Sequence, residues 1–324
     1  MIGRAREILP QSIGGIFDEA FDLYRANFGL LAGIAAVCFV PVYGATQWIG
    51  YTMGLESLVA GMQPNGSADQ QLVSLASLMS ILMLQGCLGI VGFAIEYAAL
   101  TSAVSDRYLA RRATIAGAYR TGFRSCGRLL GATILATCLT GICGFGLLYV
   151  LLLCVGLASV AGAIVGSIVP ILLGVVGVVL GISLILVTCG IACGVGAFIP
   201  QIAVLEAGGG ANGIGRNWTL ARPRIAEITM CVAAATLAPA LLQAATASSI
   251  SLALNSLLFP AIGASALTQT VCLEFVQVAT GLLVAPFPAV ALTLLYYDQR
   301  VRREGFDIAI LEEQLASDPR ASGG

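Results

Sequence analysis

The most constraining feature of this chain is the run between Arg128 and Glu206, in which no charged residue occurs. One bilayer crossing needs about 20 apolar residues, so a run of this length predicts two transmembrane helices joined by a tight turn. The rest of the chain agrees, because 58% of its residues are hydrophobic, only 10% are charged and the mean hydropathy is +0.93. We therefore expect an all-α polytopic membrane protein in which this pair is the central hairpin of three.

One further hairpin is predicted on each side of the central hairpin. Their spans cover, in chain order, residues 28–51, 72–105, a helix from about 225 onward, and 267–297. The segment 52–71 is polar and is expected to connect the first two spans, and 250–266 is expected to be a loop or an interfacial helix. Pro286 and Pro288 lie inside the last span. The total is six transmembrane helices.

A short amphipathic helix is predicted before each hairpin. The first covers residues 12–28, with Ser12 as its N-cap. Its apolar stripe recurs at helical spacing and consists of Ile13, Ile16, Phe17, Ala20, Phe21, Tyr24 and Phe28. This helix is expected to lie along the headgroup layer, the alternative being an ordinary solvated helix, and similar amphipathic patterns cover about 114–130 and 212–224.

The distribution of arginine predicts the topology. The chain has 16 arginines and no lysine, and all of them fall before the first span, between the second and third, between the fourth and fifth, or after the sixth. By the positive-inside rule, these segments and both termini lie in the cytoplasm, which requires an even number of crossings. We expect a multi-pass protein of the bacterial inner membrane.

The three units also resemble one another in spacing. An aromatic residue of each amphipathic helix (Phe21, Phe123, Trp218) precedes an acidic residue at the exit of the hairpin (Asp106, Glu206, Asp298) by about 80 to 85 residues. This spacing predicts one membrane domain over 1–324 with three repeats, at about 12–106, 114–206 and 212–298, and a cytoplasmic tail over 299–324. Because each unit crosses twice, the repeats are parallel rather than inverted.

Three segments resemble bacterial proteins grouped with the membrane domain of glycerophosphoryl diester phosphodiesterases. They are residues 13–28 (IGGIFDEAFDLYRANF), residues 200–206 (PQIAVLE) with Asn217-Trp218, and residues 297–307 (YDQRVRREGFD). The resemblance implies a stand-alone member of that family, most of whose stand-alone members have no established role. Some relatives carry a phosphodiesterase barrel after the membrane part. Since only about 27 residues follow the last span here, that activity is not expected.

Two carboxylates are predicted to lie at membrane depth. Glu96 is ten residues before Asp106, near mid-bilayer, and Glu274 is close to the outer end of the last span, one turn from Gln277. An ionisable group inside a span is by default a functional candidate. If both faced one cavity, they would form a proton or cation path. Alternatively, each is protonated or hydrogen-bonded within the bundle, or Glu274 reaches the surface.

The cytoplasmic arginines set the topology and are also candidates for contacts with anionic lipid headgroups. They are Arg107, Arg111, Arg112, Arg120, Arg124, Arg128, Arg222, Arg224, Arg300, Arg302 and Arg303. The expected partners are the bilayer, anionic headgroups, and a membrane protein partner or a second copy of the chain. No nucleic-acid partner is expected.

Residues for catalysis are scarce. The chain has no histidine, the commonest general base and metal ligand. The glycines of residues 208–213 match G-x-G-x-x-G, but a membrane helix precedes them where the motif needs a strand. We expect no catalytic residue, metal or cofactor, and therefore a non-enzymatic scaffold or accessory component of a membrane or envelope process. The alternative is a transporter or channel for a small solute, ion or lipid that uses Glu96 and Glu274.

Overall fold

The computed structural model describes residues 11–54, 68–132, 134, 196–206 and 210–305, and within these ranges the chain forms helices and turns without strands. The helices are α1 (Ile13–Ala26), α2 (Phe28–Thr52), α4 (Ala68–Tyr108), α7 (Ile199–Leu205), α8 (Gly210–Ala221), η1 (Arg222–Arg224), α9 (Ile225–Ala253), the π-helical η2 (Leu254–Leu258), α10 (Phe259–Ile262), α11 (Ala266–Val284) and α12 (Pro286–Glu304). A further helix covers residues 115–132. The all-α prediction is confirmed for the described residues.

Four helical stretches in the described residues are long and apolar enough to cross a bilayer: Phe28–Thr52, Ala76–Tyr108, Gly215–Ile262 and Thr268–Glu304. In the first three, only 17–22% of the apolar window is buried inside the protein. So much outward apolar surface needs an apolar surrounding, so the chain is a membrane-embedded protein. The predicted central hairpin falls largely on residues 135–195, outside the described residues.

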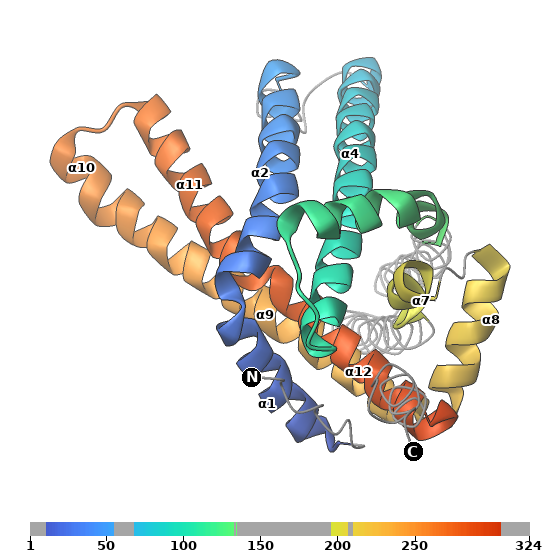
Figure 1. The fold of residues 1–324 in the computed structure, drawn as a ribbon. Helices are drawn as coiled ribbons and strands as arrows, with labels where there is room; N and C mark the ends of the chain where they lie inside the picture. Colours follow the sequence, from blue (N-terminus) through green and yellow to red (C-terminus); the bar gives the residue numbers. More distant parts are fainter. Residues whose placement is uncertain (1–10, 55–67, 133, 135–195, 207–209, 306–324) are drawn as a thin grey trace, which may run out of the picture.

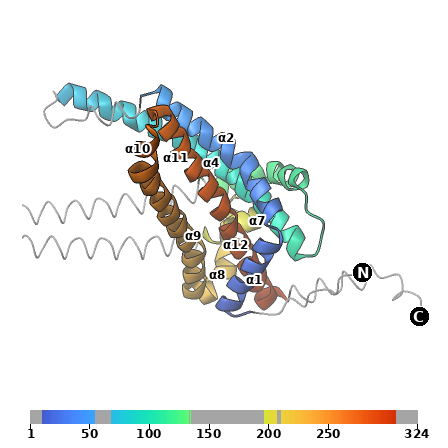
Figure 2. The same cartoon turned by 90° about the vertical axis from the view of Figure 1, so that its left-hand side faces the viewer.

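The described spans form two helical hairpins. Helix α2 packs against α4, and α9 packs against α11. Figures 1 and 2 show that the tips of both hairpins lie at one end of the molecule, whereas α1, α8 and the end of α12 lie at the other. The bundle therefore has two distinct ends, which we call the hairpin-tip end and the α12 end.

Helix α12 is the central element of the α12 end. Residues 289–299 are all buried, and α1, α4, α8 and α9 pack around the helix. It is separated from α11 at Ala285, directly before Pro286, whose ring prevents a regular helical hydrogen bond. The hydroxyl of Tyr24 in α1 donates to the carbonyl of Leu283 at 2.5 Å. Helix α1 therefore contacts the point at which the predicted last span is broken.

Helix α1 begins as predicted. The Ser12 hydroxyl accepts a hydrogen bond from the Gly15 amide at 3.2 Å, which caps the first turn. The predicted apolar stripe is only partly buried, because Ile16 and Ala20 are in the core while Phe21 is 50% exposed. One side of α1 thus packs on the bundle, and Phe21 faces outward.

Of the two alternatives expected for residues 250–266, the loop is wrong for residues 250–262, which are helical. Helix α9 continues through η2 and α10 to Ile262, and the chain turns only at Gly263, which has a positive φ of 60°. Polar residues do not end this helix because they bond to it: the Asn255 amide donates to the carbonyl of Ser251 at 2.9 Å.

Each short amphipathic helix packs on at least one other helix of the bundle. Helix α1 packs on α12, and α8 packs on α7 and α12. The 115–132 helix crosses α4 at Gly122, where an added Cβ would lie 3.2 Å from the backbone nitrogen of Ala99. Glycine therefore permits a close approach of the two backbones at this crossing.

Candidate functional site

Asp298 is a buried carboxylate of the α12 end that accepts three hydrogen bonds. It is only 6% exposed. Its Oδ1 accepts from the backbone nitrogen of Gln11 at 2.8 Å, and its Oδ2 accepts from Arg302 Nε at 2.7 Å and Gln299 Nε2 at 3.3 Å. Both oxygens are therefore satisfied, which buried carboxylates require.

Arg302 completes a connection between the start of α1 and the end of α12. Besides its ion pair with Asp298, its Nη2 donates to the carbonyl of Gln11 at 2.5 Å. Gln11 and Asp298 are 287 residues apart in the sequence. The first described residue is thus fixed on the last described helix.

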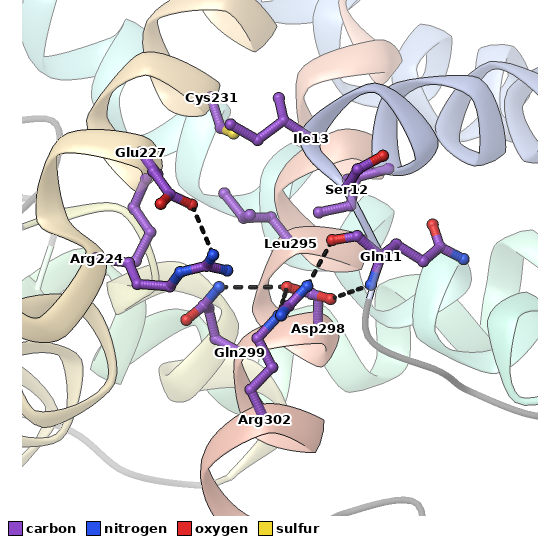
Figure 3. Close-up of a pocket in the computed structure, with 12 residues that line it drawn as sticks. Gln11, Ser12, Ile13, Arg224, Glu227, Cys231, Leu295, Asp298, Gln299 and Arg302 are labelled. Carbon is purple, nitrogen blue, oxygen red and sulfur yellow. Dashed lines mark hydrogen bonds and ion pairs between the residues drawn. The ribbon is translucent and has the colours of Figure 1, made fainter.

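A cavity of about 190 Å³ lies beside this connection, between α1, α9 and α12. Its polar wall, shown in Figure 3, contains groups from the residues directly before α1, from η1, from α9 and from α12. They are Gln11, Ser12, Arg224, Glu227, Asp298, Gln299 and Arg302. Arg224 and Glu227 form an ion pair at 3.2 Å, with side chains 41% and 44% exposed. The wall therefore holds two positive and two negative groups.

The remaining wall of the cavity is apolar. Ile13 and Ile16 come from α1, Ile228 and Cys231 from α9, and Leu295 from α12. Cys231 is buried with a free thiol. One side of the cavity is thus polar and the other resembles the protein core, as in small-molecule sites in general.

A second charged cluster joins α7, α8 and α12. Glu206 Oε2 accepts from Arg216 Nε at 2.9 Å, and Glu206 Oε1 accepts from the Tyr296 hydroxyl at 2.5 Å. Arg216 also pairs with Glu304, and Arg300 pairs with Glu206 at 3.6 Å. Two arginines and two carboxylates alternate in this cluster, which is suited to holding helices together.

The pKa of Glu206 is lowered below its ordinary value. Burial acts in the opposite direction, but hydrogen bonds from Arg216 and Tyr296 and the positive charges of Arg216 and Arg300 outweigh it. Glu206 is therefore a charged structural partner rather than a proton donor at neutral pH.

The third predicted exit residue, Asp106, lies at the end of α4. The backbone nitrogen of Arg111 donates to the Asp106 carbonyl at 2.7 Å, forming the turn. Beside it, the hydroxyls of Ser105 and Tyr297 are hydrogen-bonded at 2.6 Å. All three acidic exit residues thus lie at contacts between a long helix and a neighbouring element.

Glu274 contacts α2 directly. Its Oε2 accepts from the Tyr43 hydroxyl at 2.6 Å, and the Gln47 amide donates to both carboxylate oxygens at 2.9 Å. Gln277, predicted one turn away, is exposed on α11. Glu274 therefore fastens α11 to α2.

Glu96 lies on a different side of α2, near Cys38 and Tyr119. Cys38 and Tyr43 are five residues apart on α2, which places them about 7.5 Å apart along the axis and about 140° apart around it. Glu96 is 8% exposed. Its carboxyl group has no hydrogen bond or ion pair with another described residue. The structure therefore does not bring Glu96 and Glu274 together.

Most of the predicted cytoplasmic arginines are exposed. This holds for Arg107, Arg111, Arg112, Arg120, Arg124, Arg222, Arg224, Arg302 and Arg303, whereas Arg128 and Arg300 are half-buried. Within the described residues, Arg120, Arg124 and Arg222 form no ion pair. Their charges are thus available to a surrounding lipid or partner.

Several residues of the cavity escaped sequence reasoning. Asp298 stood out as an acidic exit residue, but Gln11, Glu227 and Cys231 did not. Nothing in the local pattern distinguishes Glu227 from an ordinary first-turn acid of α9, because its place in a cavity depends on α1 and α12. The only available signal was the charge of the Arg224 to Glu227 stretch at a predicted helix start.

The described residues contain no group of three or more His, Cys, Asp or Glu side chains arranged to hold a metal ion. Comparison of the chain with protein-family models, with curated proteins and with solved structures finds no match.

Proposed function

We propose that this protein is a non-enzymatic, six-span inner-membrane protein that acts as a scaffold or accessory component of a membrane or envelope process. The observation that carries the proposal is the set of exposed arginines on the short helices and helix ends, including Arg120, Arg124 and Arg222. An exposed cation without an internal partner contributes little to folding, so its natural use is an external contact.

Exposed aromatic side chains accompany these arginines. Phe21, Phe123 and Trp218 are 50%, 61% and 42% exposed. They occupy α1, the 115–132 helix and α8. Aromatic residues next to arginine are typical of helices that lie in a headgroup layer or dock on another membrane protein.

A threefold repeated architecture is part of this proposal. In it, each amphipathic helix packs on the closing helix of the preceding unit: α1 on α12, the 115–132 helix on α4, and α8 on α7. The acidic exit residues Glu206 and Asp298 bind the short helix or its start in two of these contacts. The order is cyclic, which supports three equivalent units around a closed ring.

The proposed topology is based on the end of the molecule at which α1 starts and α12 ends. Both the start of α1 and the end of α12 lie at the α12 end, opposite the hairpin tips (Figure 2). Since the arginine-bearing segments also follow the closing helices, the positive-inside rule favours a cytoplasmic α12 end. Anionic headgroups and a protein partner would both meet the arginines there.

Transport through a shared carboxylate path has less support. Glu274 accepts hydrogen bonds from Tyr43 and Gln47 on α2. Glu96 of α4 lies near Tyr119 and near Cys38, which is on another side of α2. A common path would need both carboxylates to face one cavity.

The test is affinity purification in a mild detergent from native membranes. The wild type is compared with a variant in which Arg120, Arg124 and Arg222 are replaced by glutamine, and with a matched variant carrying lysine at the same positions. The lysine variant keeps the charges that set the topology. We expect a reproducible membrane-protein partner or homo-oligomer with wild type, its loss with the glutamine variant and its retention with the lysine variant. Repeated recovery of a monomer alone from wild-type membranes would contradict the proposal.

A further inference from the structure

We propose that the cavity between α1, α9 and α12 binds a zwitterionic group that carries a phosphodiester and a primary ammonium, as in glycerophosphoethanolamine and the headgroup of phosphatidylethanolamine. This inference goes beyond the scaffold function and does not depend on it. It starts from the charges of the cavity wall, which are Arg224, Arg302, Glu227 and Asp298. Two groups of each sign give a wall with no net charge but with strong local fields.

The four charged side chains differ in how many of their hydrogen-bonding groups are left for a ligand. Asp298 accepts three hydrogen bonds from protein donors and is buried, so it positions the wall rather than binding a ligand. Arg302 uses its Nε and one Nη2 hydrogen on Asp298 and Gln11. A guanidinium has five N–H donors. Three donors of Arg302 therefore have no described protein partner.

The Arg224 and Glu227 pair supplies the other charges. Its closest approach is 3.2 Å, and both side chains are more than 40% exposed. An exposed pair of this kind is weak, because water screens it and both side chains are flexible. It can open at small cost and bind one group of each sign in its place.

The unused donors of Arg302 and the weak pair of Arg224 and Glu227 determine how the ligand binds. Phosphate oxygens accept hydrogen bonds from Arg224 and Arg302, since guanidinium groups match phosphate geometry. The ammonium donates to Glu227, which Arg224 releases. No covalent bond changes in this step. The ligand replaces one weak pair with three charge-assisted contacts, to Arg224, Arg302 and Glu227, and the wall remains electrically balanced.

The size and position of the cavity suit such a group. A volume of about 190 Å³ corresponds to roughly six waters at about 30 Å³ each, which is sufficient for a small headgroup. Ile16, Ile228 and Leu295 form the opposite, apolar wall. The cavity lies at the start of α1 and α9 and at the end of α12, where the long apolar helices reach their polar ends. A headgroup of a membrane phospholipid and a free zwitterion of the same chemistry both fit this description.

A simple anion fits less well. Glu227 and Asp298 would repel a phosphate that brought no positive charge of its own, and the two arginines already have carboxylate partners. The balance of signs is therefore the feature that selects a zwitterion.

The first experiment is calorimetric titration of the full chain in detergent with glycerophosphoethanolamine and, separately, with inorganic phosphate. The second is native mass spectrometry of lipids retained by the protein after release from nanodiscs that contain equal amounts of phosphatidylethanolamine and phosphatidylglycerol. Both use wild type, Arg224→Gln and Glu227→Gln. Arg303→Gln is the control, because Arg303 is an exposed arginine on the same helix end but does not line the cavity.

We expect binding of glycerophosphoethanolamine, selective retention of phosphatidylethanolamine, or both; the first alone assigns a soluble ligand and the second alone a lipid. Arg224→Gln and Glu227→Gln are each expected to weaken that binding about tenfold or more, as for loss of one charge-assisted contact, and Arg303→Gln to leave it unchanged. The proposal is overturned if neither zwitterion binds, if inorganic phosphate and phosphatidylglycerol bind as tightly, or if Arg303→Gln weakens binding as much as Arg224→Gln.

Discussion

Glu96 and Glu274 have the same side chain and similar apolar sequence surroundings, yet the structure gives them different environments. Glu274 accepts hydrogen bonds from Tyr43 and Gln47. Glu96 is 8% exposed and has no side-chain partner among the described residues. The role of a carboxylate in an apolar run therefore depends on the hydrogen-bond donors around it and not on the run itself.

The described side chains near Glu96 do not donate hydrogen bonds to its carboxyl group, as Tyr43 and Gln47 do to Glu274. The Cys38 thiol donates to the Gly92 carbonyl at 3.2 Å, and the Tyr119 hydroxyl donates to the Ile34 carbonyl at 2.6 Å. Both donors are therefore engaged. A carboxylate anion without donors is costly in an apolar interior, so the neutral acid is the form that this site accommodates. Glu274 instead acts as a clamp between two helices.

The largest expected effect comes from placing a permanent charge at the unpartnered site. Glu96→Arg is expected to destabilise the protein by about 3–5 kcal/mol, because an uncompensated charge is buried. The measurement is the folded fraction in a titration with denaturing detergent. Glu96→Gln, which resembles the neutral acid in shape, is the control and should change stability by no more than about 0.5 kcal/mol. Equal losses for both variants would show that Glu96 is held as an anion.

A second change disturbs the helix contact next to Glu96. Gly92 lies in α4 against α2, and an added Cβ would lie 2.6 Å from Cγ2 of Val42. Gly92→Ala is expected to cost about 1–3 kcal/mol, since this contact is with a stiff β-branched side chain. Gly89→Ala is the matched control, because its Cβ would meet nothing within 4 Å. It should be neutral or stabilise by up to about 1 kcal/mol, and a loss as large as that of Gly92→Ala would contradict the packing described.

The clamp at Glu274 gives a third, similar or smaller effect. Glu274→Ala leaves the Tyr43 hydroxyl and the Gln47 amide without their acceptor, which should cost about 1–3 kcal/mol. A double-mutant cycle with Tyr43→Phe, measured by the same unfolding titration, isolates the pair. The two substitutions should be clearly non-additive. Additive losses would mean that the hydrogen bond contributes nothing to stability.

Glu206 is a third carboxylate, paired with arginines. Its expected effect on stability is the smallest, since water partly screens the charged cluster. The pKa of Glu206 is lower in the folded protein than its ordinary value of 4.5. Its stabilising contribution is therefore fully present above about pH 4.5 and is lost as the pH falls through the lowered folded pKa. The midpoint of thermal unfolding, followed from neutral pH to about pH 3, should fall less steeply for Glu206→Gln than for wild type. Identical slopes would remove Glu206 from the acid response.

Much of the fold could be predicted from the sequence where the signal is local. The start of α1 follows from Ser12 and the helical recurrence of Ile16 and Ala20, and α2 coincides with the predicted first span to within about a residue at each end. Both signals depend on residues close together in the chain, namely a capping side chain and an uninterrupted apolar run.

The course of α9 was not predicted, because residues 250–266 were expected to form a loop or an interfacial helix. Asn255 and Ser256 instead bond to carbonyls one turn earlier, Ser251 and Leu252. A π-helical segment, Leu254–Leu258, precedes Pro260. Helix continuation was therefore decided by side-chain to backbone bonds that composition does not reveal.

The candidate site was only partly predictable for a similar reason. Asp298 could be identified as an acidic residue at a helix exit, and Glu96 and Glu274 as ionisable groups in apolar runs. The partner of Asp298 is Gln11, which is brought to it only when α1 packs on α12. Sequence alone gives the chemical groups, whereas the docking of helices decides which of them share a cavity.

The claim on which the account depends most is that the arginine-bearing α12 end faces the cytoplasm and the hairpin tips face the opposite side. The direct measurement uses paired topology reporters, one active only in the cytoplasm and one only outside it, fused after Gly305 or inserted after Gly263. The account predicts a cytoplasmic signal at Gly305 and an external signal at Gly263. Signals from the same side at both positions, or an external signal at Gly305, would contradict it.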